Sequence, residues 1–147
     1  MKTIFNQNTV EELVLRINTL EANDTAQWGK MNAYQMVKHC SLGEEMFLGK
    51  KTYKRLFIGR LFGSTALKGI LKDEKPIKKN QPTHPEMKIT GIGNFENEQK
   101  KWIALLLEYP TFSNTNFVHP FFGKMSKEKV GQFVYKHADH HLNQFGK

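Results

Sequence analysis

Three of the six histidines in the 147-residue chain lie close together near its C-terminus, at positions 137, 140 and 141. His137 and His141 are four residues apart, so in a helix they lie one turn apart on the same face. Two imidazoles in this arrangement can bind one divalent metal ion from one side. A catalytic metal site needs three protein ligands and an open position for water or substrate. The pair therefore supplies two of the three ligands, and another segment would have to supply the third.

A further histidine, His39, lies in the middle of another segment that is expected to be helical. This helix spans about residues 33–48 and begins after Asn32, a good N-cap residue. In a helical bundle its apolar face turns inward, so His39 can meet His137 and His141 around one ion. Gly43 lies one turn beyond His39 and leaves room for a ligand or, more simply, for close helix packing. Histidines four residues apart are also often surface or hydrogen-bonded pairs, so the spacing alone leaves both interpretations open.

Four other side chains are candidates to line a pocket around this site. Cys40 lies about 100° around the helix from His39, where we expect a small buried apolar residue whose thiol is still near the site. His119 lies in a loop, where it either shapes a turn or forms the rim of a pocket. His140 lies on the shoulder of the last helix's inward face, and Gln144 lies on that face. No catalytic role can be assigned to any of them.

The elements that position these residues are helices. The first spans about residues 10–20, with Thr9 as its N-cap and Glu12 reaching back to it in a capping box. The second carries His39, and the third spans about residues 95–109 after the cap residue Asn94.

The last helix spans about residues 127–144 and begins after Ser126, its N-cap. Its inward face follows four- and three-residue spacing: Val130, Val134, His137, His141 and Gln144. No segment shows convincing strand alternation. The pattern predicts a single all-α domain over residues 1–147, built as a helical bundle.

The least regular part of the chain is residues 50–86. Apolar residues there can form one or two short helices interrupted by Gly59, Gly63 and Gly69, and prolines exclude regular structure from residues 75–85. Residues 50–79 hold ten basic and two acidic residues, which leaves 12 of each sign for the rest of the chain. The formal net charge of +8 therefore belongs to this basic segment.

Two kinds of anionic partner would suit the basic segment. Lys and Arg interleaved with Leu, Phe and Ile can lie on an anionic membrane surface. They can also neutralise the phosphates of nucleic acid. The simpler interpretation is a solvated basic face over a small apolar patch. The segment supports an alternative function, that of a non-catalytic binding protein that uses residues 50–79.

The composition and the absence of known motifs narrow the choice of cellular compartment and of enzyme class. Cys40 is the only cysteine, so no internal disulfide can form, as is typical of a reducing compartment. No signal-peptide core follows the N-terminus, and the longest apolar run, residues 102–107, is too short to span a bilayer. We therefore expect a cytoplasmic protein. The chain has no G-x-S-x-G sequence, Walker loop, dinucleotide fingerprint or C-x-x-C pair.

Four stretches together resemble a known family: residues 28–31 (Trp-Gly-Lys-Met), 35–40 (Gln-Met-Val-Lys-His-Cys), 119–126 and 136–146. The most specific elements are His-Pro-Phe-Phe-Gly at residue 119 and His-x-x-His-His-x-x-Gln-Phe-Gly at residue 137. In combination they resemble the DUF1569 family, an uncharacterised branch of the DinB-like superfamily. The resemblance covers nearly the whole chain.

The resemblance implies a DinB-like four-helix bundle with a long crossover, here residues 50–86, between the second and third helices. It also implies a three-histidine site for a divalent ion such as Zn²⁺ or Ni²⁺, which maps onto His39, His137 and His141. Some superfamily members are transferases or isomerases that use a low-molecular-weight thiol, and many are dimers. The leading hypothesis is a divalent-metal-dependent enzyme, a hydrolase or thiol-dependent transferase, that acts on an unknown small molecule and forms a homodimer.

Overall fold

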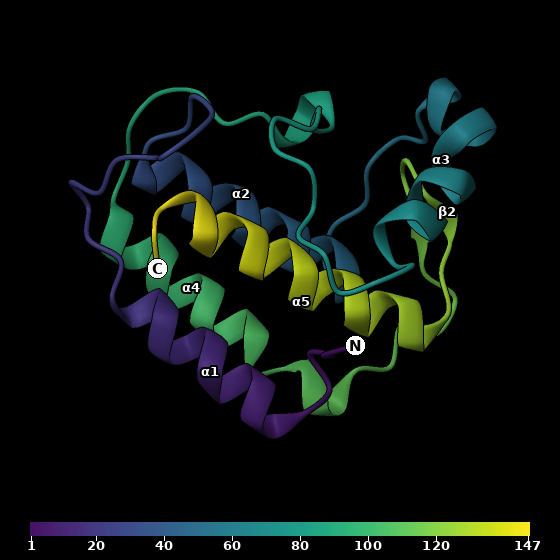
Figure 1. The fold of residues 1–147 in the computed structure, drawn as a ribbon, viewed down its shortest axis with the longest axis horizontal. Coiled ribbons are helices and arrows are strands. Elements are labelled where there is room, and N and C mark those ends of the chain that lie inside the picture. The colour runs from purple at the N-terminus through teal and green to yellow at the C-terminus, as the bar shows by residue number, and fades with distance from the viewer.

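The computed structural model describes residues 1–147 and contains five α-helices (Figure 1). They are α1 (Gln7–Asn18), α2 (Ala33–Phe47), α3 (Phe57–Ile70), α4 (Phe95–Leu106) and α5 (Lys127–Gln144). Two single 3₁₀ turns, η1 (Pro85–Met87) and η2 (Tyr109–Thr111), and a two-residue hairpin, β1 (Val118–His119) with β2 (Gly123–Lys124), complete the fold. The predicted all-α class is confirmed.

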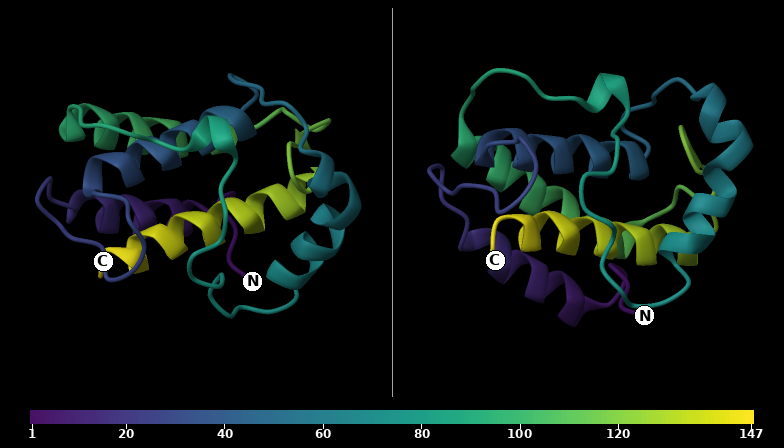
Figure 2. Two further views of the ribbon diagram at one scale, coloured as in Figure 1. Left: turned by 90° about the horizontal axis from the view of Figure 1, so that it is seen from above. Right: turned by 45° about the horizontal axis from the view of Figure 1, so that its top comes forward.

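Four of the helices form a bundle, in which α2 packs against α4 and α5, and α1 packs against the same two helices from the other side. In Figure 1, α2 and α4 run in the same direction. After α2 the chain must therefore run back along the bundle before α4 begins. This return segment is the long crossover that the resemblance implies. This crossover holds α3, which stands apart from the four-helix core (Figure 2).

Local signals set most of the helix starts. The side chain of Asn32 accepts a hydrogen bond from the Gln35 backbone N–H group at 2.8 Å, and the Gln35 side chain accepts one from the Asn32 backbone N–H group at 3.1 Å. Asn94 and Ser126 cap α4 and α5, because each side chain accepts a hydrogen bond from the backbone N–H group three residues further along. The prediction for Thr9 is wrong, because Asn6, an equally good cap, accepts from Asn8 and starts α1 three residues earlier.

Other parts of the chain also differ from the sequence-based expectations. Helix α4 ends at Leu106, and a 3₁₀ turn containing Pro110 follows it. The segment before Ser126, expected to be a loop, includes the short hairpin, whose turn is formed by residues 120–122 and whose second strand begins at Gly123 with φ 84°. Residues 57–70 form one continuous helix, and Gly59 and Gly63 lie inside it as its buried face instead of interrupting it.

The core between the four bundle helices is apolar and aromatic. Trp102, Tyr109 and Phe47 are its largest fully buried side chains. Glu44 is buried among them and accepts a hydrogen bond from the Tyr109 hydroxyl. No helix is both long enough and apolar enough to cross a membrane.

Candidate metal centre

The structure brings together three histidines from two helices. His39 projects from α2, and His137 and His141 project from α5, with one ring nitrogen of each within 4.8 Å of the other two. The Nε2 atoms of His39 and His137 are 3.2 Å apart. His39 and His141 are buried, and His137 is partly exposed. These are the three residues that the sequence analysis selected as ligands.

Gly43 of α2 faces the ring of His137. A Cβ atom at Gly43 would lie 3.7 Å from Cε1 of His137 and 3.8 Å from the Cε atom of Met87. These distances are ordinary van der Waals contacts, so the space beside His39 is already filled by protein. Of the two interpretations of Gly43, close packing is the one that the structure shows.

Two of the three rings are held by hydrogen bonds at Nδ1. The Nδ1–H group of His39 donates to the backbone carbonyl of Met87 at 3.3 Å. The Nδ1–H group of His141 donates to Oε1 of Gln144 at 2.9 Å. A carbonyl oxygen can only accept, so both rings carry their hydrogen on Nδ1 when they are neutral. Their Nε2 atoms therefore face the cluster as lone pairs, the arrangement found in metal-binding histidines.

Gln144 is itself fixed by the turn at residues 28 and 29. Its Nε2 atom donates to the backbone carbonyl of Trp28 at 2.7 Å, which orients Oε1 toward His141. Gly29 has φ 84°, and a Cβ atom there would lie 2.6 Å from Nε2 of Gln144. Glycine takes this backbone conformation without strain and leaves room for the Gln144 amide. The Trp28–Gly29 turn therefore positions a metal-site histidine through Gln144.

The distance between His39 and His137 indicates what can occupy the cluster. Two lone pairs cannot face each other at 3.2 Å, so either His137 carries a hydrogen on Nε2 or a cation lies between the rings. Two nitrogens that each lie about 2.0–2.1 Å from a tetrahedral ion are about 3.3–3.4 Å apart. The observed separation is close to that value, so these residues fit a metal ion.

Burial favours the neutral form of all three rings. It lowers the pKa of His39 and lowers those of His137 and His141 well below the usual range, because charge in this dry site is poorly solvated. The neighbouring histidines lower the pKa of His137 further. Neutral imidazole is the form that binds metal ions, so the site is ready to bind at neutral pH.

His140 lies at the edge of this centre. Its ring centroid is 5.2 Å from that of His141 and 5.8 Å from that of Trp28. The Lys79 ammonium lies 4.1 Å above the Trp28 ring, so the crossover loop covers this side of α5. Burial lowers the pKa of His140 as well.

Cys40 and His119 lie outside the group of three. The Cys40 thiol is fully buried, contacts the Met36 sulfur at 3.8 Å and has a pKa raised by burial, as expected of a small apolar residue. His119 shapes the hairpin, because its Nδ1 atom accepts from the backbone N–H groups of Phe121 and Phe122 at 3.1 and 3.2 Å. Burial lowers the pKa of His119 to about 3.

Three contributors to the centre were not anticipated from the sequence. They are the carbonyl of Met87, the carbonyl of Trp28 and the ring of Phe133, which stacks on His137 at 5.8 Å. Backbone acceptors have no side-chain signature, and η1 lies in a segment that prolines marked as irregular. The three-residue spacing of His141 and Gln144 did carry a signal for their contact on one helix face.

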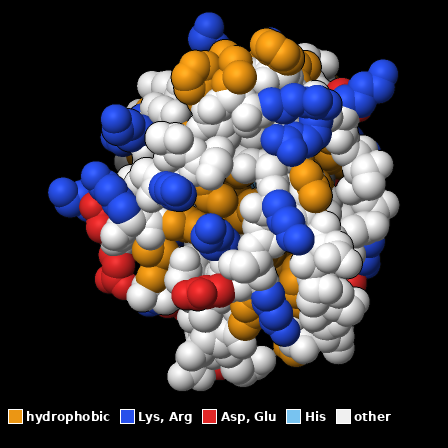
Figure 3. Space-filling view, turned by 90° about the vertical axis from the view of Figure 1, so that its right-hand side faces the viewer, with side chains coloured by type: hydrophobic (Ala, Val, Ile, Leu, Met, Phe, Trp, Pro, Cys, Tyr) orange, Lys and Arg blue, Asp and Glu red, His pale blue; other side chains and the backbone are white.

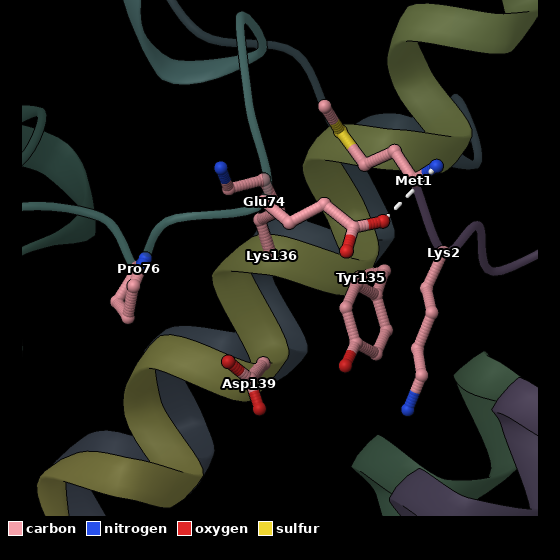
Figure 4. A pocket seen from close by; sticks show the side chains of 7 residues that line it. All are labelled: Met1, Lys2, Glu74, Pro76, Tyr135, Lys136 and Asp139. Atoms are coloured by element: carbon pink, nitrogen blue, oxygen red, sulfur yellow. Dashed lines mark ion pairs between the residues drawn. The ribbon is translucent and has the colours of Figure 1, made fainter.

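A separate hollow of about 130 Å³ lies on another side of α5 (Figure 4). It is lined by Met1, Lys2, Glu74, Pro76, Tyr135, Lys136 and Asp139, and the Met1 amine pairs with Glu74 at 3.2 Å. None of the three clustered histidines lines it. Asp139 also pairs with Arg16 at 2.7 Å.

The comparisons with known proteins identify a family without a described activity. Residues 4–147 match the family described as "Protein of unknown function (DUF1569)". No curated protein and no solved structure matches the chain. Because the match spans almost the whole chain, the protein belongs to the DUF1569 family.

Proposed function

We propose that this protein is a metal-dependent enzyme in which His39, His137 and His141 hold one divalent ion. The orientation of the rings is the observation that carries the proposal. Met87 and Gln144 occupy Nδ1 of His39 and His141, which leaves Nε2 of each ring free to bind an ion. The Nε2 atom of His39 lies 3.2 Å from that of His137, close to the separation of two nitrogens bound to one ion. The resemblance to the DinB-like superfamily supports the same assignment.

The ligand set favours Zn²⁺ or Ni²⁺. Three imidazoles without a carboxylate or a thiolate suit these borderline ions, whereas Mg²⁺ and Ca²⁺ prefer oxygen ligands. Three protein ligands also leave a position open for a substrate, as in catalytic sites.

The reaction that fits best is hydrolysis or thiol transfer. When bound, such an ion lowers the pKa of water or of a thiol and polarises a carbonyl group. The three ligands are neutral, so they leave the ion's positive charge uncompensated, and an anionic group such as a thiolate is favoured at the open position. The rings of His39 and His141 are buried, whereas His137 is partly exposed, so the site is accessible from the side of His137. We therefore propose a small anionic or thiol-containing substrate.

Metal analysis of protein purified without a histidine tag tests the proposal. We expect about one Zn²⁺ or Ni²⁺ per chain in the wild type and almost none in His137→Ala/His141→Ala. His84→Ala is the matched control, because His84 bonds to the Lys54 carbonyl outside the cluster. Circular dichroism shows that each variant is folded. Equally low metal content in all three proteins, also after dialysis against Zn²⁺ or Ni²⁺, would contradict the proposal.

A further inference from the structure

Helix α3 exposes its large apolar side chains to solvent and buries its small residues, unlike an ordinary surface helix. It directs Gly59, Gly63 and Leu67 toward the protein. Its large apolar residues face solvent: Phe57 is 76% exposed, Ile58 58%, Leu61 63% and Phe62 59%. A surface helix normally buries its apolar stripe against the core. The outward face of α3, defined by these four residues, therefore lacks a partner within the chain.

The two buried glycines enforce this orientation. A Cβ atom at Gly63 would lie 1.9 Å from the carbonyl oxygen of Phe121, and one at Gly59 would lie 2.5 Å from the same atom. Only a glycine face can therefore lie this close to the hairpin backbone. If α3 rotated to bury its large residues, their side chains would collide with the hairpin.

Polar contacts fix both ends of α3 in place. At its start, the Leu56 N–H group donates to the Pro120 carbonyl at 3.0 Å. At its end, the Lys136 ammonium on α5 donates to the carbonyls of Ile70 and Asp73 at 2.7 and 2.8 Å. The outward face is thus held rigidly on the bundle and is not a loosely attached segment.

Positive charge surrounds this face. The chain has no Asp or Glu between residues 46 and 72, whereas Lys54, Arg55, Arg60 and Lys68 are all exposed. In Figure 3, which looks onto this side of the molecule, Lys and Arg side chains lie between and around hydrophobic patches. Helix α3 thus combines large apolar side chains with cations. The few acidic side chains on this side of the molecule come from other elements, such as Glu128 of α5, which lines the same hollow as Lys68.

We propose that the outward face of α3 binds to an anionic lipid surface. Exposed Phe, Leu and Ile flanked by Lys and Arg are typical of helices that lie in the membrane interface, with the apolar face buried about 5–10 Å. Nucleic acid would satisfy the cations but would leave the four apolar side chains unmatched. A second copy packed symmetrically on α3 would bring Arg60 and Lys68 against the same cations. This proposal is independent of the metal centre.

Sedimentation with lipid vesicles tests the proposal. The full chain should bind vesicles of phosphatidylcholine mixed with phosphatidylserine at low salt, bind less as salt screens the charges, and not bind phosphatidylcholine alone. Leu61→Ser/Phe62→Ser should weaken binding at least about tenfold through lost apolar burial. Arg60→Gln/Lys68→Gln should weaken it roughly thirtyfold at low salt. Leu15→Ser is the matched control, because Leu15 is 69% exposed on α1, and it should bind as the wild type does.

Circular dichroism and thermal unfolding check that the variants are folded. No binding to anionic vesicles at low salt, or unchanged binding by Leu61→Ser/Phe62→Ser, overturns the proposal. If sedimentation equilibrium instead shows a dimer that Leu61→Ser/Phe62→Ser abolishes, without vesicle binding, the partner is a second copy. If duplex DNA binds and only Arg60→Gln/Lys68→Gln weakens it, the partner is nucleic acid.

Discussion

Gln144 fixes the tautomer of His141, three residues earlier on the same helix. Its Oε1 atom lies 2.9 Å from Nδ1 of the histidine and can only accept, so the ring hydrogen is on Nδ1. The Trp28 carbonyl, 2.7 Å from Nε2 of Gln144, prevents the amide from flipping. A loop that precedes α2 thereby controls which nitrogen of an α5 histidine faces the metal centre.

Removing this contact should weaken metal binding without unfolding the protein. In Gln144→Leu, the Nδ1–H group of His141 loses its acceptor, and we expect Zn²⁺ or Ni²⁺ affinity to fall about 10–100-fold. Gln132→Leu is the control, because Gln132 bonds only to Glu128 on the same helix. Titration of metal-free protein measures both affinities. Equal affinities would mean that the Gln144 contact does not support the site.

The two site helices could be predicted because their signals are local. Asn32 and Ser126 are cap residues beside regular apolar patterns, and both helices begin where these residues predict. His39 and His137 are 98 residues apart in the sequence, so no local spacing predicts that their rings meet. It was expected from the bundle architecture and the family resemblance.

The orientation of α3 could not be predicted for a different reason. An apolar pattern shows that a helix has an apolar face, but it does not show whether that face meets the protein. Here the buried contact is made by Gly59 and Gly63 against the carbonyl of Phe121, which is a backbone atom. Glycines within an apolar segment suggested interruptions, although in this helix they form the packing surface.

The raised pKa of Glu44 should make the free energy of unfolding decrease as the pH rises. Burial raises its pKa from 4.5 to about 7, and the Tyr109 hydroxyl only partly offsets this. Between these two pH values the folded state keeps a proton that the unfolded state has lost, so unfolding becomes easier as the pH increases. The total effect is on the order of 3 kcal/mol.

Glu44→Gln keeps the size and an acceptor for Tyr109 but cannot ionise. Denaturant unfolding at a series of pH values should show the variant gaining stability relative to the wild type from pH 4.5 to above pH 7. The histidines contribute equally to the pH dependence of both proteins, so their contribution cancels in the comparison. Parallel pH profiles would show that Glu44 does not titrate in this range.

In contrast to Glu44, the lowered pKa of His119 should make the free energy of unfolding increase as the pH rises. Its pKa falls from 6.5 to about 3 on burial, so between these values the unfolded state binds a proton that the folded state does not. Stability should decline as the pH falls, by a total on the order of 4–5 kcal/mol. The oxygen of His119→Asn can replace Nδ1 as the acceptor for Phe121 and Phe122, but it does not titrate.

His119→Asn should therefore be less stable than the wild type at pH 7, because ring packing is lost, and this difference should shrink on acidification. His119→Ala also removes the acceptor and should cost about 1–3 kcal/mol more at every pH. Unfolding curves of the three proteins measure both effects. A gap between wild type and His119→Asn that stays constant with pH would contradict the assignment.

Two glycines of α3 should respond in opposite ways to the same change. A methyl group at Gly63 would lie 1.9 Å from the Phe121 carbonyl oxygen, whereas a methyl group at Gly69 meets nothing within 4 Å. We expect Gly63→Ala to destabilise the protein by about 1–3 kcal/mol, because α3 must move off the hairpin. Gly69→Ala should stabilise it by up to about 1 kcal/mol, since alanine favours a helix. Chemical denaturation measures both, and limited proteolysis should cut the crossover faster in Gly63→Ala alone. Similar behaviour of the two variants would mean that α3 is not held by its glycine face.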